Sequence, residues 1–257
     1  MTTLKFLGTG SAFTLEPGNF QSNMILELNR RKLLIDCGTD IRFSLAKELL
    51  TYKDITDIYI SHLHADHVGG LEYIGFNTYF DPSCDRPRIY AATPLLELLW
   101  DRSLKGGMKD LNGKTATLST YFDPIHLEAE EEWVFEGLMI SPVKTCHVHN
   151  GLNWMPSYGL LIEGKETKNT FLSTDTKLSP NLKGHYNYAD LIFHDCETAC
   201  ASSVHAHYPD LAKLPSHQKR KMWLYGHHGD FPDAEKDEFL GFVKRGQVFY
   251  LDKREPT

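Results

Sequence analysis

The sequence predicts an α/β protein of one domain, with two stacked sheets that helices cover on their outer sides. Three observations predict this class. Strand-like segments occur in two groups along the chain, and helical segments follow each group. No internal repeat, low-complexity tract or long linker interrupts residues 1–257, so a single domain is expected. Hydrophobic residues make up 41% of the 257 residues, which is ample for a large core.

The first group of predicted elements lies in the N-terminal half. Each strand is a short apolar run, and the second and third strands form a hairpin pattern with a turn at residues 29–31. The predicted strands span residues 4–7, 23–28, 32–36, 57–60 and 88–91. Helical periodicity predicts helices at residues 41–50, 71–79 and 94–104, the last with proline in its first turn.

The second group follows a long segment, residues 81–132, in which few motifs are recognisable and whose role stays open. Its predicted strands span residues 133–136, 138–143, 159–163, 170–173, 191–195, 222–225 and 248–251. A short helix is expected at residues 208–214.

Composition narrows the function classes. The formal net charge is −7, and the two basic clusters, residues 30–32 and 219–221, are short enough to be solvated turns. Because proteins that grip nucleic acid usually show a basic face, a small substrate is expected and stable nucleic-acid binding is not. No apolar run approaches the length of a membrane span, and no signal peptide is visible. Five scattered cysteines fit reduced thiols, so a cytoplasmic protein is expected.

The most informative segment is S-H-L-H-A-D-H-V-G-G at residues 61–70, within a chain that holds 13 histidines. His62, His64, Asp66 and His67 are four metal-ligand side chains in six positions, and their spacing does not line one helix face. They are expected on a sharp loop after strand 57–60, in two sets that face two nearby points. Imidazole and carboxylate groups suit Zn, Mn or Fe. The alternative is a solvated His-rich loop.

Further ligands are expected where a His or Asp directly follows a strand, because rigid backbone holds geometry there. Three places qualify: residues 145–149, 173–176 and 224–228. The first and the last each contain two histidines.

The pattern H-x-H-x-D-H resembles the signature of the metallo-β-lactamase superfamily, which consists mostly of dinuclear metal hydrolases. The resemblance implies an α/β metallo-β-lactamase αββα sandwich, with two stacked mixed sheets flanked by helices. It also implies two divalent metal ions, foremost Zn²⁺ with Mn²⁺ as the alternative. One ion would be held by His62, His64 and His147, and the other by Asp66, His67 and His227, with Asp175 between them.

Within these sets the resemblance prefers His147 to His149 because of its spacing to Tyr158. The choice between His227 and His228 stays open. Asp36 matches another motif of the superfamily and is expected to order the metal loop through hydrogen bonds rather than to bind metal.

Three further segments resemble the tRNase Z-like phosphodiesterase branch of the superfamily: L-G-T-G-S-A, L-L-I-D-C-G and S-T-D-T. In that branch an acidic residue orients a histidine that protonates the leaving oxygen. Mapped here, Asp195 would orient His205, and Asp66 would orient the attacking hydroxide. The alternative is that Asp195 and His205 lie on an exposed turn. Only 27 residues separate His147 from Asp175, so the long tRNA-clamping arm of tRNase Z is missing.

The chain as a whole resembles the anti-Pycsar cyclic-nucleotide phosphodiesterases of phages and bacteria. That resemblance implies hydrolysis of 3′,5′-cyclic mononucleotides, such as cyclic CMP and cyclic UMP, and a homodimer that completes its site across the interface. Trp154, Tyr158 and Tyr121 are candidates to stack on the base, although each is a plausible core residue. Alternatives are a tRNase Z-like endoribonuclease that processes RNA 3′ ends, a thioester or lactam hydrolase, and a non-catalytic metal-binding scaffold.

Overall fold

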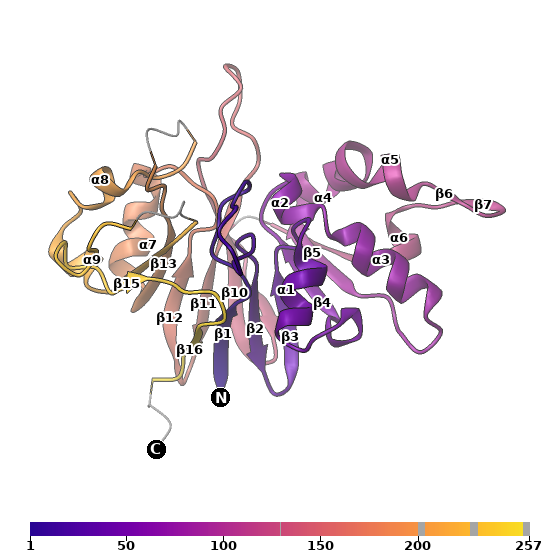
Figure 1. The fold of residues 1–257 in the computed structure, drawn as a ribbon, viewed down its shortest axis with the longest axis horizontal. Coiled ribbons are helices and arrows are strands. Elements are labelled where there is room, and N and C mark those ends of the chain that lie inside the picture. The colour runs from indigo at the N-terminus through magenta and orange to yellow at the C-terminus, as the bar shows by residue number, and fades with distance from the viewer. Residues whose placement is uncertain (129, 200–203, 227–230, 254–257) are drawn as a thin grey trace.

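The computed structural model describes residues 1–257 apart from 129, 200–203, 227–230 and 254–257. Two seven-stranded sheets pack face to face in the middle of the molecule, and helices lie on the outer side of each (Figure 1). The predicted αββα sandwich is therefore confirmed. Among the described residues, no helix is both long enough and apolar enough to cross a membrane.

The first sheet has the strand order β16-β1-β2-β3-β4-β5-β8. Strands β3, β4, β5 and β8 run parallel to one another, and the remaining pairs are antiparallel. The bounds are Thr2–Phe6 (β1), Met24–Leu28 (β2), Arg31–Ile35 (β3), Asp57–Ile60 (β4), Arg88–Ala92 (β5), Asp123–Leu127 (β8) and Val248–Tyr250 (β16).

The second sheet has the order β15-β14-β13-β12-β11-β10-β9 and is also mixed, with β12 to β15 parallel. The bounds are Trp133–Phe135 (β9), Leu138–Lys144 (β10), Tyr158–Gly164 (β11), Thr167–Leu172 (β12), Leu191–Asp195 (β13), Met222–Tyr225 (β14) and Gly241–Phe242 (β15).

The helices fall into two sets that cover opposite faces of the sandwich (Figure 1). Those over the first sheet are Ile41–Lys47 (α1), Ala65–Val68 (α2), Leu71–Phe80 (α3), Thr93–Leu99 (α4), Lys105–Met108 (α5) and Leu118–Tyr121 (α6). Those over the second sheet are Lys183–Tyr188 (α7), Tyr208–Leu211 (α8) and Ser216–Lys219 (α9). Short 3₁₀ turns occur at Tyr52–Asp54 and Pro180–Leu182.

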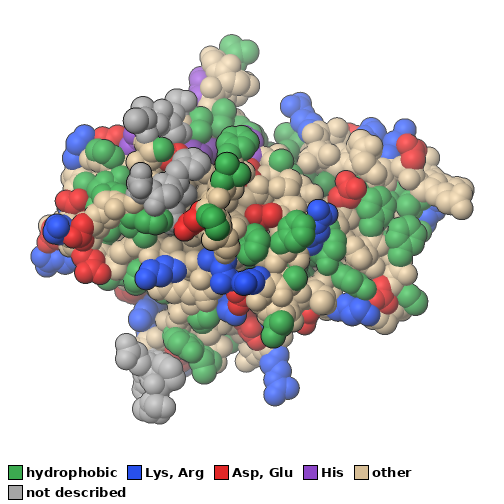
Figure 2. Space-filling view, viewed as in Figure 1, with side chains coloured by type: hydrophobic (Ala, Val, Ile, Leu, Met, Phe, Trp, Pro, Cys, Tyr) green, Lys and Arg blue, Asp and Glu red, His purple; other side chains and the backbone are tan. Residues whose placement is uncertain are grey.

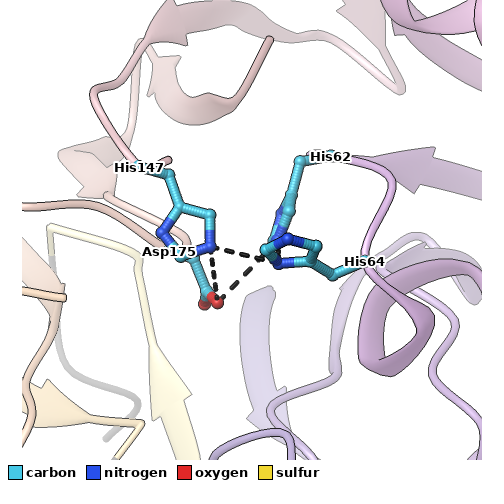
Figure 3. Close-up of side chains that lie close together, drawn as sticks. All are labelled: His62, His64, His147 and Asp175. Atoms are coloured by element: carbon cyan, nitrogen blue, oxygen red, sulfur yellow. Dashed lines mark hydrogen bonds and ion pairs between the residues drawn. The ribbon is translucent and has the colours of Figure 1, made fainter. Parts of the chain in front are cut away.

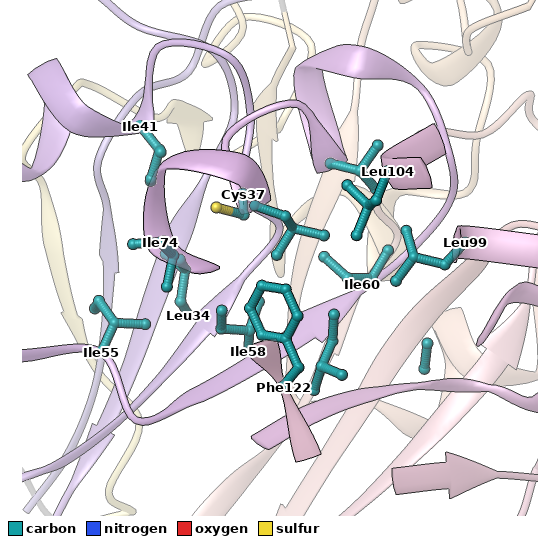
Figure 4. Packing of buried hydrophobic residues seen from close by; sticks show 14 of the residues in the cluster. Leu34, Cys37, Ile41, Ile55, Ile58, Ile60, Ile74, Leu99, Leu104 and Phe122 are labelled. Atoms are coloured by element: carbon teal, nitrogen blue, oxygen red, sulfur yellow. The ribbon is translucent and has the colours of Figure 1, made fainter. Parts of the chain in front are cut away.

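Three apolar layers follow from the alternation of side chains along each strand. In β3, Leu33 and Ile35 point between the sheets, whereas Leu34 points outward beneath the N-terminal helices. In β13, Phe193 faces the space between the sheets and Ile192 faces α7 to α9. Figure 4 shows the packing of the layer beneath the N-terminal helices.

The main differences from the sequence prediction in residues 81–132 concern one predicted helix and one strand. The predicted helix 94–104 is α4 followed by a π-helical turn, Trp100–Leu104, and the chain continues into α5 and a small hairpin, Asp110–Leu111 (β6) and Lys114–Thr115 (β7). The edge strand β8 was not predicted, because its sequence D-P-I-H-L contains proline and polar residues. Proline is tolerated there because an edge strand leaves one side of its backbone unpaired.

The topology places the predicted metal-ligand segments together. Strands β4, β12, β13 and β14 each belong to the parallel part of a sheet, and each ends at a His or Asp of the predicted site or within three residues before one. In such sheets the carboxyl ends of parallel strands form the natural edge for a binding site.

Candidate metal centre

The segment after β4 carries its four side chains on a bend and a single helical turn. One residue, Ser61, separates His62 from the end of β4, and His64 is the N-cap of α2. Asp66 and His67 lie within α2, so they are on one turn of helix and not on a continuing loop as predicted. Because of the bend, His62 and His64 join one group of donor atoms, and Asp66 and His67 join a second group.

The first donor group consists of His62, His64, His147 and Asp175 (Figure 3). His62 and His64 come from the segment after β4, and His147 and Asp175 come from the segments after β10 and β12 of the second sheet. The Nε2 atoms of His62 and His147 lie 3.0 and 3.2 Å from Nδ1 of His64. The Oδ2 atom of Asp175 lies 3.8 Å from His62 Nε2 and 3.7 Å from His147 Nε2.

The protonation of these rings fits metal ligation. The Nδ1 atom of His147 lies 2.9 Å from the backbone oxygen of Val204, which can only accept, so Nδ1 carries the proton and Nε2 carries a lone pair. Tetrahedral Zn²⁺ with nitrogen ligands separates neighbouring donors by about 3.3 Å, close to the spacing of these nitrogens. Burial lowers the pKa of His62 and of His64, which keeps both rings neutral, as ligands must be.

The second donor group consists of Asp66, His67 and Asp175. The Nε2 atom of His67 lies 3.1 Å from Oδ2 of Asp66 and 3.3 Å from Oδ2 of Asp175. Burial acts to lower the pKa of His67, but the carboxylates of Asp175, Asp36 and Asp66 raise it well above its ordinary value. The second group therefore favours positive charge, and Asp175 belongs to both groups.

Asp36 supports both groups without belonging to either. Its Oδ2 atom accepts hydrogen bonds from His67 Nδ1 and from the Ser61 hydroxyl, each at 2.7 Å. The Ser61 hydroxyl has no second proton, so at 3.0 Å it accepts from Nδ1 of His62. One carboxylate thus directs the Nε2 atoms of His62 and His67 toward the two groups, which is the ordering role predicted for Asp36.

Asp195 and His205 form a third cluster with Asp175. The Oδ2 atom of Asp195, at the end of β13, accepts from His205 Nδ1 at 2.7 Å and from the Thr176 amide at 3.0 Å. Burial acts to lower the pKa of His205, but Asp195 foremost, with Asp175 and Glu197, raises it to about 10. The His205 imidazolium is therefore held beside Asp175, which belongs to both donor groups.

The remaining predicted residues are His149, the three aromatic candidates, and His227 with His228. His149 lies outside the donor groups, in the loop between β10 and β11 that rises above the sheets, with its ring against Trp154. Trp154 is 40% exposed, whereas Tyr158 is only 5% exposed and Tyr121 is fully buried. The two tyrosine rings belong to the core, which leaves Trp154 as the candidate for stacking on a base.

His227 and His228 lie outside the described residues. The chain just before them is fixed, because the Gly226 amide donates to the Thr9 oxygen at 3.0 Å and a Cβ on Gly226 would lie 2.5 Å from Oδ1 of Asp195. The end of β14 is therefore adjacent to the cluster of Asp195 and His205, here called the acid cluster. Gly226 has a φ of +83°, which a residue with a side chain rarely adopts.

Sequence reasoning missed the residues that orient the candidate ligands. Ser61 is the first residue of the ligand segment, so its position next to H-x-H was a usable signal. The Val204 carbonyl carried no signal, because any residue supplies a backbone oxygen.

Comparison with known proteins places this geometry in context. Residues 2–249 match the sequence model of the family described as Anti-Pycsar protein Apyc1. A relative of that name from Paenibacillus harenae is 36% identical over 237 residues, which cover 90% of this chain and 91% of the relative. Another from Bacillus phage vB_BveM-Goe7 is 31% identical over 264 residues, covering 98% and 96% of the two chains.

Solved structures show the same fold at low sequence identity. The metallo-β-lactamase fold protein YhfI from Bacillus subtilis has a TM-score of 0.74 and 15% identity, over 96% of this chain and 98% of YhfI. A diphosphatase from the PhnP family has a TM-score of 0.73 and 18% identity, over 98% and 99% of the two chains. The short form of human tRNase Z has a TM-score of 0.68 and 20% identity, over 97% and 99%.

Proposed function

The chain belongs to the anti-Pycsar protein Apyc1 family, and from that premise we propose that it is a metal-dependent phosphodiesterase that hydrolyses 3′,5′-cyclic mononucleotides. Cyclic CMP and cyclic UMP are the proposed substrates, with broad tolerance for the base, and linear nucleotides are the products. The observation that carries the proposal is the sharing of Asp175 by two donor groups and by the cluster that contains His205. Its biological effect would be to blunt cyclic-nucleotide signalling against phage.

The donor groups suit two divalent ions, Zn²⁺ foremost and Mn²⁺ as the alternative. His62, His64 and His147 would hold one, and Asp66, His67 and His227 the other, with Asp175 as a ligand of both. When bound, such ions neutralise charge on phosphoryl oxygens and lower the pKa of a water molecule.

The protein's own residues then supply the proton transfers. Asp66, whose carboxylate lies beside His67, would accept a hydrogen bond from the attacking water and so orient it. His205 would donate its Nε2 proton to the leaving ribose oxygen as the P–O bond breaks, because its Nδ1 is already bonded to Asp195. A positioned general acid of this kind typically contributes 10²–10⁴-fold to a rate.

Several features support a compact substrate. Between His147 and Asp175 lie only an exposed loop and strands β11 and β12, without an arm for gripping RNA. In the face that Figure 2 shows, Lys and Arg side chains are interspersed with Asp and Glu. Trp154 is exposed near the site, with the Lys177 ammonium 5.6 Å from its ring centre, and is the proposed stacking partner of the base.

A homodimer, a single domain over residues 1–257 and a cytoplasmic location complete the proposal. The apolar side chains of Phe13 and Leu15, in the loop between β1 and β2, and of Leu152, between β10 and β11, are 86% to 95% exposed. Exposed apolar side chains of this size on two loops support a contact with a second copy.

A hydrolysis panel tests the proposal. Purified protein loaded with Zn²⁺ or Mn²⁺ is incubated with cyclic CMP, UMP, AMP and GMP, with a precursor tRNA and with a β-lactam, and Asp66→Ala serves as the blank. Turnover of the cyclic nucleotides alone is expected. Cleavage of the tRNA with the cyclic nucleotides untouched would instead assign an endoribonuclease.

A further inference from the structure

A buried tyrosine–histidine pair lies behind the acid cluster, outside the metal-donor groups. Tyr186 belongs to α7 and His194 to β13, and both side chains are fully enclosed in the apolar layer beneath α7 to α9. The Tyr186 hydroxyl lies 2.5 Å from Nε2 of His194. The other ring nitrogen, Nδ1, lies 2.6 Å from the backbone oxygen of Asp195.

The direction of each hydrogen bond follows from its partners. A backbone oxygen only accepts, so His194 Nδ1 carries the proton and donates it to Asp195. In a neutral ring Nε2 is then an acceptor, and the Tyr186 hydroxyl donates to it. Burial lowers the pKa of His194 to about 4, so the ring is neutral at physiological pH and this order of donors is stable.

Within the described part of the chain, three further hydrogen bonds hold Asp195 besides the one to His205. Its amide donates to the Ser173 hydroxyl at 2.9 Å, its Oδ2 accepts from the Thr176 amide, and its backbone oxygen accepts from His194. Only the last of these depends on a second side chain, Tyr186, whose hydroxyl holds the far side of the His194 ring. If that hydroxyl is removed, Nε2 loses its partner, and the bond to the Asp195 oxygen alone then orients the ring.

We propose that Tyr186 and His194 are positioning residues that hold Asp195 in the place from which it orients His205. The inference rests on the proposed function, because it assigns His205 as the acid that protonates the leaving oxygen. Displacements of about 1 Å in a catalytic group can cost 10²-fold in rate, so a fixed backbone behind Asp195 has a measurable consequence. The rival interpretation is a buried pair that serves stability alone.

The first experiment compares Tyr186→Phe with Tyr90→Phe. Both hydroxyls are hydrogen-bonded and both side chains are buried, but that of Tyr90 donates to Asp57 in the first sheet. Each variant is assayed on cyclic CMP, whose alkoxide leaving group needs a proton, and on bis(p-nitrophenyl) phosphate, whose leaving group does not. We expect Tyr186→Phe to lose about tenfold in kcat on cyclic CMP with KM unchanged, less than the full contribution of a general acid. It should lose less than about twofold on the nitrophenyl ester.

His194 supplies a rescue test. His194→Asn places an amide N–H where Nδ1 donates, and should retain most of the kcat on cyclic CMP, whereas His194→Leu should lose it. A readout without turnover is the downfield proton resonance of the His205 Nδ1–H···Asp195 bond in metal-free protein. We expect it to shift or broaden in Tyr186→Phe and in His194→Leu, and to be unchanged in Tyr90→Phe.

Equal losses on both substrates, or an unchanged resonance with full activity, would overturn the inference. Failure of the proposed function has a different signature. In that case wild-type protein would leave cyclic CMP intact while hydrolysing the nitrophenyl ester, and the resonance would still report whether the pair positions Asp195.

Discussion

The Oδ2 atom of Asp36 lies 2.7 Å from Nδ1 of His67, and both side chains are buried. Asp36 occupies the turn after β3 with a φ of +62°, a left-handed conformation that aspartate and asparagine adopt more readily than most residues. A residue keeps such an uncommon backbone conformation where the surrounding structure fixes the orientation of its side chain. Here the orientation sets which nitrogen of His67 faces Asp66 and Asp175.

Asp36→Asn is expected to weaken metal binding. The substitution keeps the left-handed backbone but can place an amide N–H opposite His67 Nδ1, which drives the ring proton to Nε2 and blocks that ligand atom. Loss of such a supporting partner typically costs 10–100-fold in metal affinity. Competition titration with a chromophoric chelator measures the change.

Asp57→Asn is the matched control for this prediction. Asp57 is as buried as Asp36, but it lies at the start of β4 and pairs with Arg31 and Arg88. This variant should lower the free energy of unfolding and leave metal affinity unchanged. Equal affinity losses in both variants would show that Asp36 acts only through general stability.

His64→Ala and Asp66→Ala are each expected to abolish hydrolysis of cyclic nucleotides while the fold persists. His64 and Asp66 are only partly buried, and their loss opens no cavity in the apolar layers. Circular dichroism checks the fold, and metal analysis with the cyclic-nucleotide assay checks the site. Wild-type turnover in either variant would contradict the two-ion arrangement.

Gly70→Ala is expected to destabilise the metal loop. A Cβ at this position would lie 2.2 Å from the backbone oxygen of Gly38, which belongs to the turn after β3. Overpacking of this kind typically costs about 1–3 kcal/mol. Thermal unfolding and metal titration measure the effect. Gly106→Ala in α5 is the control, since a Cβ there meets nothing within 4 Å, and it should be neutral or slightly stabilising.

Acidification is expected to destabilise the metal-free protein through His194. Its pKa in the folded state is about 4, below the ordinary value of about 6.5 in an unfolded chain. Between these values the unfolded chain binds a proton that the native ring does not, so the free energy of unfolding falls as the pH falls. From pH 7 to pH 5, wild type should lose about 2 kcal/mol more than His194→Asn.

Urea titrations at the two pH values, with a chelator present, measure this difference. Metal must be absent because its binding is itself dependent on pH. A wild-type loss no larger than that of His194→Asn would mean that His194 is protonated in the folded state, contrary to its burial.

Much of the fold was readable from the chain because strand patterning is local. The ranges of β4, β13 and β14 were predicted as they occur, since each is a short apolar run with clear ends. Strand β8 was missed because an edge strand needs no apolar pattern. The break in helix 94–104 was missed because the π-helical turn keeps helical backbone angles on both sides.

By itself the sequence determined which residues could act as ligands. The spacing of His62, His64, Asp66 and His67 confines them to one bend after a strand, because neighbours in the chain cannot move far apart. Only the tertiary structure decided which distant groups meet them. The packing of two sheets brings Asp175 to both donor groups and places His147, but not His149, in the first donor group. It also buries Tyr158 and leaves Trp154 exposed. The tautomers set by Asp36 and Val204 depend on contacts between segments far apart in the chain, which covalent spacing does not fix.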